Sequence, residues 1–192
     1  MNQVSKEVVY LIGINHDIQL NKDCNLSKQF LNTLENLILD FDIRFVFEEW
    51  SVDVNKIWKV KSSTIKRLVD KMKKELKNNI DHSYCDPELH ERINENIKDE
   101  NDLKKEHGWI GLLTPEQRMI IDCEMWKEYE KREKIWLKKI VDKIKDKNVV
   151  FICGTKHISI FNTLRGEGFD TLLTKSGYII KVIPERFDKW YK

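Results

Sequence analysis

The chain has 192 residues, of which 41% are hydrophobic and 34% are charged, with a formal net charge of +2 at pH 7. This length and apolar content suffice for one core but not comfortably for two, so we expect a single domain over 1–192. The charges nearly balance, which argues against a nucleic-acid partner, and no stretch reaches the ~20 apolar residues of a membrane span.

The first half of the chain predicts a strand–helix–strand unit. Residues 7–13 form a short, continuously apolar strand, and residues 26–38 place their apolar side chains at helical spacing. Residues 43–50, with the sequence IRFVFEEW, form a second strand that closes in two glutamates. A unit of this length predicts parallel strands joined by a right-handed crossover.

The middle of the chain has weaker patterns. Residues 62–76 predict an amphipathic helix, and residues 87–98 give only a weak helical pattern. We expect the polar region over about 58–113 to form a helical cap or lid beside the sheet.

A long helix and a second set of strands follow. Thr114, Pro115 and Gln117 give the signature of a helix start with a capping box, and the helix is expected to continue to about Lys145. The remaining predicted elements are a strand over 148–153, a helix from about 157, a short helix after Gly168 and a last strand over 177–183. The fold class is therefore α/β, with a mostly parallel sheet, flanking helices and a helical lid insertion.

The cysteines give no sign of a disulfide framework or a zinc site. Cys24, Cys85, Cys123 and Cys153 are scattered without a CxxC pair, so we expect buried free thiols. The N-terminus also lacks the apolar stretch of a signal peptide. Together these features predict a cytoplasmic protein with no membrane partner.

The same short motif follows two of the predicted strands. Gly13 and Gly154 each end a strand, and each is followed three residues later by a histidine, His16 and His157. Glycine at such a position permits backbone conformations that are closed to other residues. Because ligands bind outside the carboxyl ends of parallel strands, we expect both histidines at one edge of the sheet.

Two glutamates should reach the same edge. Glu48 and Glu49 end the second strand, and neighbours on a strand point to opposite faces, so we expect them to have different roles. One of them would ligate a metal or act as a base, while the other would pair with a lysine or arginine.

The chemistry of this edge stays open between two kinds of site. Two histidines and a carboxylate suit a divalent metal of the Mn, Co or Zn type, with His16, Glu49 and His157 as ligands. The same side chains suit a metal-free site in which a histidine, tuned by a carboxylate, is the general base. For either histidine alone, a loop residue that caps its neighbourhood is the simpler interpretation, and the repeat of the motif favours a site.

The long helix adds two charged candidates. Arg132 and Glu133 fall on stripes of apolar residues, where charges are costly unless they are paired. A buried Arg–Glu pair that locks the helix to the sheet is one interpretation. In the other, Arg132 reaches the site and holds a carbonyl, carboxylate or phosphate with its planar fork.

The other polar candidates are weaker. We expect His82, His90 and His107, which lie in the poorly patterned middle, to be solvated. Gln19 could orient His16 or a water through its amide, or it could be an exposed loop residue.

Four short motifs, in this order, resemble the TraB/Tiki, ChaN-like and erythromycin-esterase-like superfamily. They are GINH at 13–16, FEE at 47–49, KREKIW at 131–136 and CGTKHISIF at 153–161. They are spread over most of the chain, and the segment 58–113 lies outside the resemblance. The positions that match are His16, Glu48 or Glu49, Arg132 and His157.

The resemblance implies an α/β core with a site at one edge of the sheet, and a hydrolase. The Tiki branch is described as metal-dependent proteases, with both motif histidines and a glutamate at the metal. The esterase branch hydrolyses a lactone with histidine as base, and the ChaN-like branch binds haem.

These observations favour a small cytoplasmic hydrolase of an ester, lactone or amide bond, acting on a small molecule or a peptide. The motif histidines and one of the two strand-end glutamates would hold the metal. The other glutamate or Glu133 would move protons, and Arg132 would stabilise the oxyanion. The alternatives are a non-catalytic module that binds haem or an anionic ligand in the same cleft, and a polar cluster that only braces the fold. The oligomeric state stays open.

Overall fold

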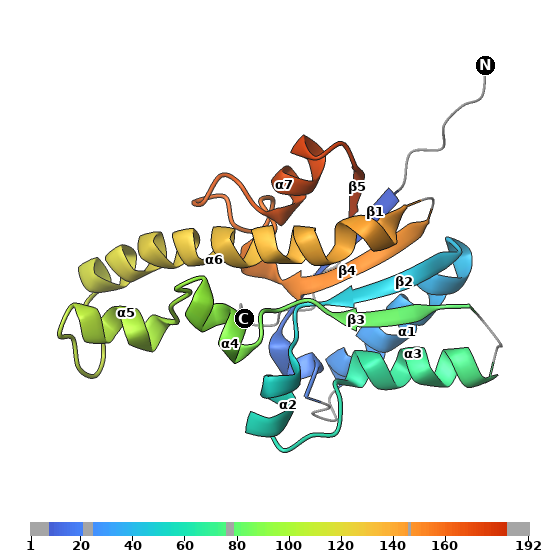
Figure 1. Ribbon diagram of the computed structural model, residues 1–192, viewed down its shortest axis with the longest axis horizontal. Coiled ribbons are helices and arrows are strands. Elements are labelled where there is room, and N and C mark those ends of the chain that lie inside the picture. The colour runs from blue at the N-terminus through green and yellow to red at the C-terminus, as the bar shows by residue number, and fades with distance from the viewer. Residues whose placement is uncertain (1–7, 21–24, 76–78, 146, 184–192) are drawn as a thin grey trace.

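A five-stranded sheet lies at the centre of the computed structural model, which describes residues 8–20, 25–75, 79–145 and 147–183 (Figure 1). Its strands are β1 (Val8–Ile14), β2 (Ile43–Glu48), β3 (Asp81–Tyr84), β4 (Asn148–Gly154) and β5 (Ile179–Val182). They lie in the order β3-β2-β4-β1-β5, and every neighbouring pair is parallel. The α/β fold predicted from the sequence is confirmed, and the sheet is parallel throughout.

The helices of the described residues are α1 (Asn25–Asp40), α2 (Val52–Ile57), α3 (Thr64–Glu75), α4 (Leu89–Asn94), α5 (Glu100–Glu106), α6 (Pro115–Ile144) and α7 (Phe169–Lys175). Two 3-10 turns, η1 (His16–Ile18) and η2 (Thr155–His157), directly follow β1 and β4. The capping box at the start of α6 is formed as predicted, because Thr114 Oγ1 accepts a hydrogen bond from the Gln117 N–H and Gln117 Oε1 accepts one from the Thr114 N–H. None of these helices is both long enough and apolar enough to cross a membrane.

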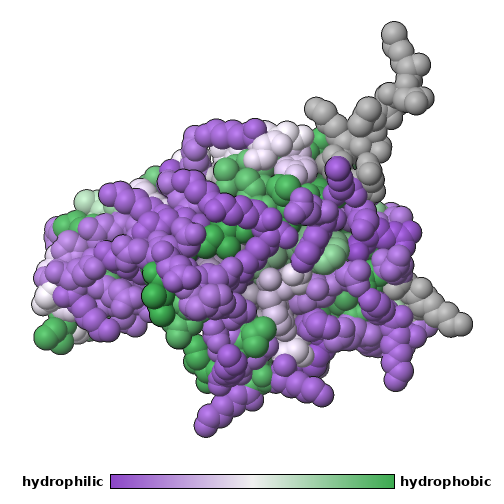
Figure 2. Space-filling view, in the orientation of Figure 1, coloured by the Kyte–Doolittle hydropathy of each residue, from purple (hydrophilic) through white to green (hydrophobic). Residues whose placement is uncertain are grey.

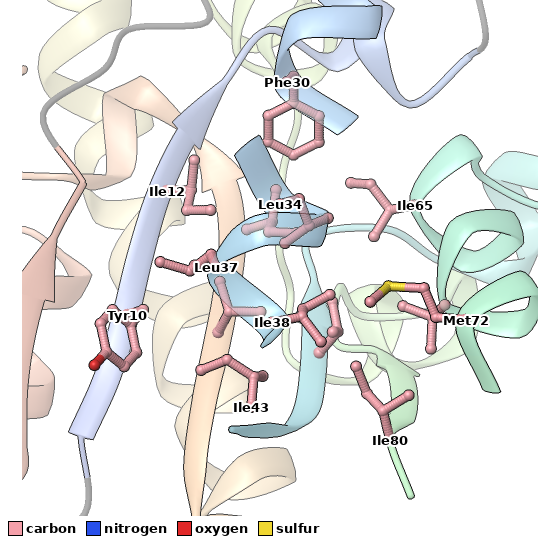
Figure 3. Close-up of a cluster of buried hydrophobic side chains, with 14 of the residues drawn as sticks. Tyr10, Ile12, Phe30, Leu34, Leu37, Ile38, Ile43, Ile65, Met72 and Ile80 are labelled. Carbon is pink, nitrogen blue, oxygen red and sulfur yellow. The ribbon is translucent and has the colours of Figure 1, made fainter. Parts of the chain in front are cut away.

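Each face of the sheet is covered by its own pair of helices. One core cluster joins β1 and β4 to α1 and α3, with Phe30, Leu34 and Ile38 of α1 lying over Ile12 (Figure 3). The cluster on the opposite face joins the same strands to α6 and α7. Strands β1 and β4 are therefore buried on both faces, which explains why they read as continuous apolar runs.

Strand β4 lies between β1 and β2, although it comes last of the three in the sequence. Gly13 of β1 pairs with Cys153 of β4, and Glu48 of β2 pairs with Ile152. These registers bring the carboxyl ends of the three strands to one edge of the sheet. Such an edge is where open parallel sheets bind their ligands.

The predicted lid over about 58–113 is not one unit. Its first part supplies α3, which packs into the core, and β3, which pairs with β2 at the edge of the sheet. Of this region, α4 and α5 extend beyond the carboxyl ends of the strands, beside the N-terminal half of α6 (Figure 1). The sequence of β3, DHSY, is short and polar because an edge strand is only partly buried, so it gave no apolar pattern.

The predicted helix from about 157 is wrong. After the turn η2, Ile158 adopts an extended conformation, with φ −112° and ψ 122°. The Ser159 N–H then donates to Asp170 Oδ1 at 2.9 Å, so the carboxylate at the start of α7 replaces a helical partner. A local side-chain acceptor of this kind competes with helix formation.

The prediction of buried thiols is confirmed for two cysteines. Cys85 and Cys153 are free and buried, and burial raises the pKa of Cys85 to about 12. Cys123 is exposed, because it lies on the outer side of the N-terminal half of α6. Cys24 lies outside the described residues.

Candidate functional site

Three strand ends and one helix bring four side chains together, with the carboxylate of Glu49 at the centre of the other three. His16 follows β1, Glu49 follows β2, His157 follows β4 and Arg132 lies on α6. Glu49 Oε1 accepts a hydrogen bond from Arg132 Nη2, and it lies 3.4 Å from His157 Nε2 and 3.7 Å from His16 Nε2. The sequence therefore predicted correctly that these residues share one edge of the sheet.

Glu49 is a buried anion whose two oxygens are both engaged. Its Oε2 accepts a hydrogen bond of 2.6 Å from the Gly154 N–H, while Oε1 faces the guanidinium and the two imidazoles. Burial by itself would raise the pKa of Glu49, but the positive charges of His157 and Arg132 hold it well below the ordinary value of 4.5. The group is therefore a fixed negative charge at neutral pH.

Gly154 lies where a larger residue would crowd the site. A Cβ at this position would lie 3.2 Å from His16 Nε2 and 3.4 Å from Glu49 Oε2. Its backbone, with φ −61° and ψ 142°, is open to any residue, so the conformational freedom expected from the sequence is not what selects glycine here. The motif glycine instead lets the histidine of β1 approach the end of β4.

His16 is the exposed member of the group and is held in one tautomer. Its side chain is 51% exposed, and its Nδ1 lies 2.5 Å from Gln19 Oε1. The Gln19 Nε2 donates to Glu48 Oε1 at 2.8 Å and to the Glu49 backbone oxygen at 3.1 Å. Because both of those partners only accept, the amide must turn its oxygen toward His16. Nδ1 then carries the proton, and the neutral ring keeps a lone pair on Nε2.

Without the Gln19 amide, the His16 ring should no longer be restricted to the Nδ1–H tautomer. In Gln19→Leu we expect His16 to populate both neutral tautomers, because Nδ1–H loses its acceptor. The ¹³Cδ2 chemical shift of the His16 ring, measured by NMR in alkaline solution, distinguishes the two forms. A wild-type ring that is already mixed, or a variant that stays Nδ1–H, would contradict this assignment.

His157 is buried between two carboxylates. Its Nδ1 lies 2.7 Å from Glu133 Oε1, and its Nε2 faces Glu49. Burial by itself would lower the pKa of His157, but the charge of Glu49 and the hydrogen bond to Glu133 raise it above the ordinary 6.5. The ring also packs against Tyr129 and Trp136, with centroids 4.5 and 4.6 Å away. His157 is thus a buried brace of the site, and its surroundings favour the cationic form of the ring.

These opposed shifts predict a stability maximum in mildly acidic solution. The contribution of Glu49, whose pKa is lowered, is present above about pH 4.5 and is lost as the pH falls. The contribution of His157, whose pKa is raised, is present below about pH 6.5 and is lost as the pH rises through its folded-state value. In urea unfolding, the free energy of unfolding of His157→Gln should therefore fall less above pH 6.5 than that of the wild type. His90→Gln, which changes an exposed histidine, should keep the wild-type profile.

Glu133 is held by an arginine that the sequence analysis did not single out. Arg165 donates to it through Nη1 at 2.5 Å and through Nη2 at 2.7 Å, in a bidentate pair. Both side chains are almost fully buried. Glu133 therefore fixes His157, and the pair joins α6 to the loop before α7.

Glu48 points away from the other candidates, as expected for neighbours on a strand. Its Oε1 accepts from Gln19, and its Oε2 accepts from Ser63 Oγ at 2.7 Å and lies 2.8 Å from His82 Nε2. His82 was predicted to be solvated, but its side chain is 3% exposed because β3 places it beside Glu48. This second cluster reaches the site only through the Gln19 amide.

Arg132 is positioned by a carboxylate that follows β3. Its Nε and Nη2 donate to Asp86 Oδ1 at 2.9 and 2.7 Å, and the opposite oxygen of Asp86 accepts from Arg92 at 2.5 Å. Nη1 makes no hydrogen bond within the described part of the chain and is not a buried, unpaired atom. The side chain is 13% exposed, so part of it reaches the surface.

The donor set, as it is placed, does not fit the predicted metal. The three predicted ligands converge, but each Glu49 oxygen already accepts a hydrogen bond, and the guanidinium on Oε1 would repel a second cation. Among the residues that the structure describes, no group of three or more His, Cys, Asp or Glu side chains has the arrangement of a metal site. The divalent metal stays a prediction.

Two of the residues that build the site, Asp86 and Arg165, could not be singled out from the sequence, and the role of a third, Gln19, was left open. Asp86 follows a strand that had no apolar pattern, and Arg165 lies in a segment expected to be helical. Gln19 was left open between an orienting amide and an exposed loop residue, and it is fully buried. Its spacing of three residues from His16, across one 3-10 turn, was the available signal.

No family model matches the chain, and the curated proteins and the solved structures contain no match either. The resemblance to the TraB/Tiki, ChaN-like and erythromycin-esterase-like superfamily therefore rests on the four short motifs and stays a prediction.

Proposed function

We propose that this protein is a hydrolase of carboxylic esters, lactones or amides in which His16 is the general base. The observation that carries the proposal is the setting of His16, a half-exposed ring whose Nδ1 lies 2.5 Å from Gln19 Oε1 and whose Nε2 faces the Glu49–Arg132 pair. The resemblance to a superfamily that includes hydrolases is a second, weaker support.

His16 Nε2 and Glu49 Oε1 are 3.7 Å apart, too far for a direct hydrogen bond but suitable for a water that bridges them. In the proposed reaction His16 takes a proton from this water as the water oxygen attacks the carbonyl carbon. The bond to the leaving group then breaks, and the imidazolium returns the proton to the departing alcohol or amine. Water is consumed, and the acid and the alcohol or amine are released.

The negative charge that develops on the carbonyl oxygen needs a donor held in place beforehand. Arg132 supplies it through Nη1, because Asp86 and Glu49 fix the other side of its guanidinium. A donor that is already oriented stabilises the transition state without reorganisation during the reaction. Glu49 and His157 therefore act by positioning Arg132 and by setting the local field.

The experiment that tests the proposal is a panel of p-nitrophenyl esters, aryl lactones and aryl amides, assayed with a chelator and separately with Mn²⁺, Co²⁺ or Zn²⁺. We expect turnover of at least one of these bond types in the presence of the chelator. Turnover only with added metal would reject His16 as the base and would favour the predicted metal-bound water as the nucleophile. No turnover under any condition would reject the hydrolase and favour a non-catalytic binding site.

A further inference from the structure

A cavity lies beyond the carboxyl ends of β2 and β3, between α2, α4 and α5. Its volume is about 870 Å³, within the size range of pockets that hold small organic ligands. Its apolar lining comes from Val54, Ile57, Pro87, Leu89, Ile93 and Ile97. Ile57, Leu89 and Ile93 are 73%, 61% and 69% exposed, so the hollow is open to solvent and presents apolar side chains at the surface. Figure 2 shows hydrophobic surface over this part of an otherwise largely hydrophilic face.

The charges around this cavity neutralise one another. The pairs are Asp53 with Lys56 at 2.8 Å, Arg92 with Asp86 at 2.5 Å, Lys98 with Glu106 at 2.7 Å and Lys105 with Asp102 at 3.9 Å. Asp99, the remaining charged residue of the lining, caps α5 by accepting from two backbone N–H groups. Apart from Asp99, each charged residue of the lining therefore has a partner of opposite charge, and the chemistry of the lining suits an uncharged, apolar group.

The wall of the cavity is built from residues next to those of the candidate site, although His16, Glu49, Arg132 and His157 do not line it. Ser51 lines the cavity and lies two residues after Glu49, and Pro87 lines it and directly follows Asp86. Arg92, also in the lining, donates to the same Asp86 carboxylate that positions the guanidinium of the site. The two chain segments are joined where the Asp86 N–H donates to the Trp50 backbone oxygen.

A second connection runs through α6. The Lys98 N–H, in the cavity wall, donates to Glu128 Oε2 at 3.0 Å, and Lys131 Nζ donates to the Asn96 backbone oxygen at 2.8 Å. Lys131 is the residue before Arg132. The wall of the cavity and the donor of the site are therefore held by the same turns of α6.

The walls are also fixed relative to one another. Glu88, just before α4, accepts hydrogen bonds from the Val52 and Asp53 N–H groups at the start of α2. Asp53 in turn accepts from the Leu89 N–H at the start of α4. This reciprocal capping fixes the starts of the two helices relative to one another. The cavity between them therefore exists before a ligand enters.

We propose that this cavity receives an uncharged, apolar acyl group of the substrate while its carbonyl lies at His16 and Arg132. The inference rests on the proposed hydrolase and assigns its substrate class, namely esters or lactones of medium-length or branched apolar acids. The class follows from the paired charges of the rim, the apolar lining and the adjoining wall.

The first test is a chain-length series of p-nitrophenyl esters from acetate to hexanoate. Each buried methylene should raise kcat/KM by about three- to fourfold, so the wild type should prefer hexanoate by roughly 100-fold. Ile93→Glu and Leu89→Glu, both at exposed positions that should not disturb folding, should remove most of this preference. Leu39→Glu, a matched exposed position on α1, should keep it. A flat series in the wild type would overturn the inference.

The second test does not depend on hydrolysis. Nile red, an uncharged apolar dye, should bind the wild type with a fluorescence increase that 1-hexanol displaces and that Ile93→Glu abolishes. If Nile red binds in this way but no ester is turned over, the apolar site stands and the hydrolase is rejected. If esters are hydrolysed but Nile red binding is absent or indifferent to Ile93→Glu, the hydrolase stands and the cavity is not its acyl site.

Discussion

Replacement of His16 by alanine is expected to lower kcat for the best ester by about 100- to 10,000-fold, the usual contribution of a general base. The reason is that Nε2 of His16, on a half-exposed ring, faces the Glu49–Arg132 pair, where the proposed reaction takes place. The free energy of unfolding should change by only about 1 kcal/mol, because the ring is half exposed and makes one hydrogen bond, to Gln19.

Stopped-flow or steady-state assays give kcat, and urea unfolding gives the stability of the same preparations. His90→Ala, which alters an exposed histidine outside the cluster, is the matched control and should keep wild-type kcat. A His16→Ala protein that retains more than a tenth of wild-type kcat would show that another group is the base. A protein that loses several kcal/mol would show instead that the ring braces the fold.

Glu49→Ala is expected to destabilise the protein by about 3–5 kcal/mol, the typical result of removing one partner from a buried ion pair. The change leaves the buried Arg132 guanidinium without its short contact to the strand end, and it leaves the Gly154 N–H without its 2.6 Å acceptor. It also removes the negative charge that faces His157.

Urea unfolding of Glu49→Ala beside Glu130→Ala measures this effect. Glu130 is an exposed glutamate on α6, and its replacement should change the free energy of unfolding by no more than about 0.5 kcal/mol. Glu49→Gln, which keeps an acceptor for the Gly154 N–H, should fall between the two. If Glu49→Ala is as stable as Glu130→Ala, the carboxylate is not the centre of the cluster.

Much of the fold could be predicted because the buried strands and helices carry strong patterns. β1 and β4 are buried on both faces and therefore read as unbroken apolar runs, and the capping box of Thr114 and Gln117 marked the start of α6. β3 was missed because an edge strand of four polar residues has no such pattern. The position of β4 between β1 and β2 is a property of the whole sheet and is not encoded in any short segment.

Part of the candidate site could likewise be predicted from the sequence, and part could not. The two Gly-x-x-His motifs and the glutamates could be placed at one sheet edge, since parallel strands align their carboxyl ends. The separate roles of Glu48 and Glu49 also followed from the alternation of side chains along a strand. Asp86 and Arg165 pair with Arg132 and Glu133 over long sequence separations, and no local pattern signals a partner of that kind.

We propose that His16 activates water for hydrolysis in a site without a metal ion. To test this, kcat/KM of the chelator-treated wild type is measured for p-nitrophenyl butyrate, and the metal content of the same sample is measured by elemental mass spectrometry. We expect undiminished turnover in protein that holds far less than one metal ion per chain, and its loss in chelator-treated His16→Ala. Turnover that disappears with the metal and returns on its addition would contradict the account.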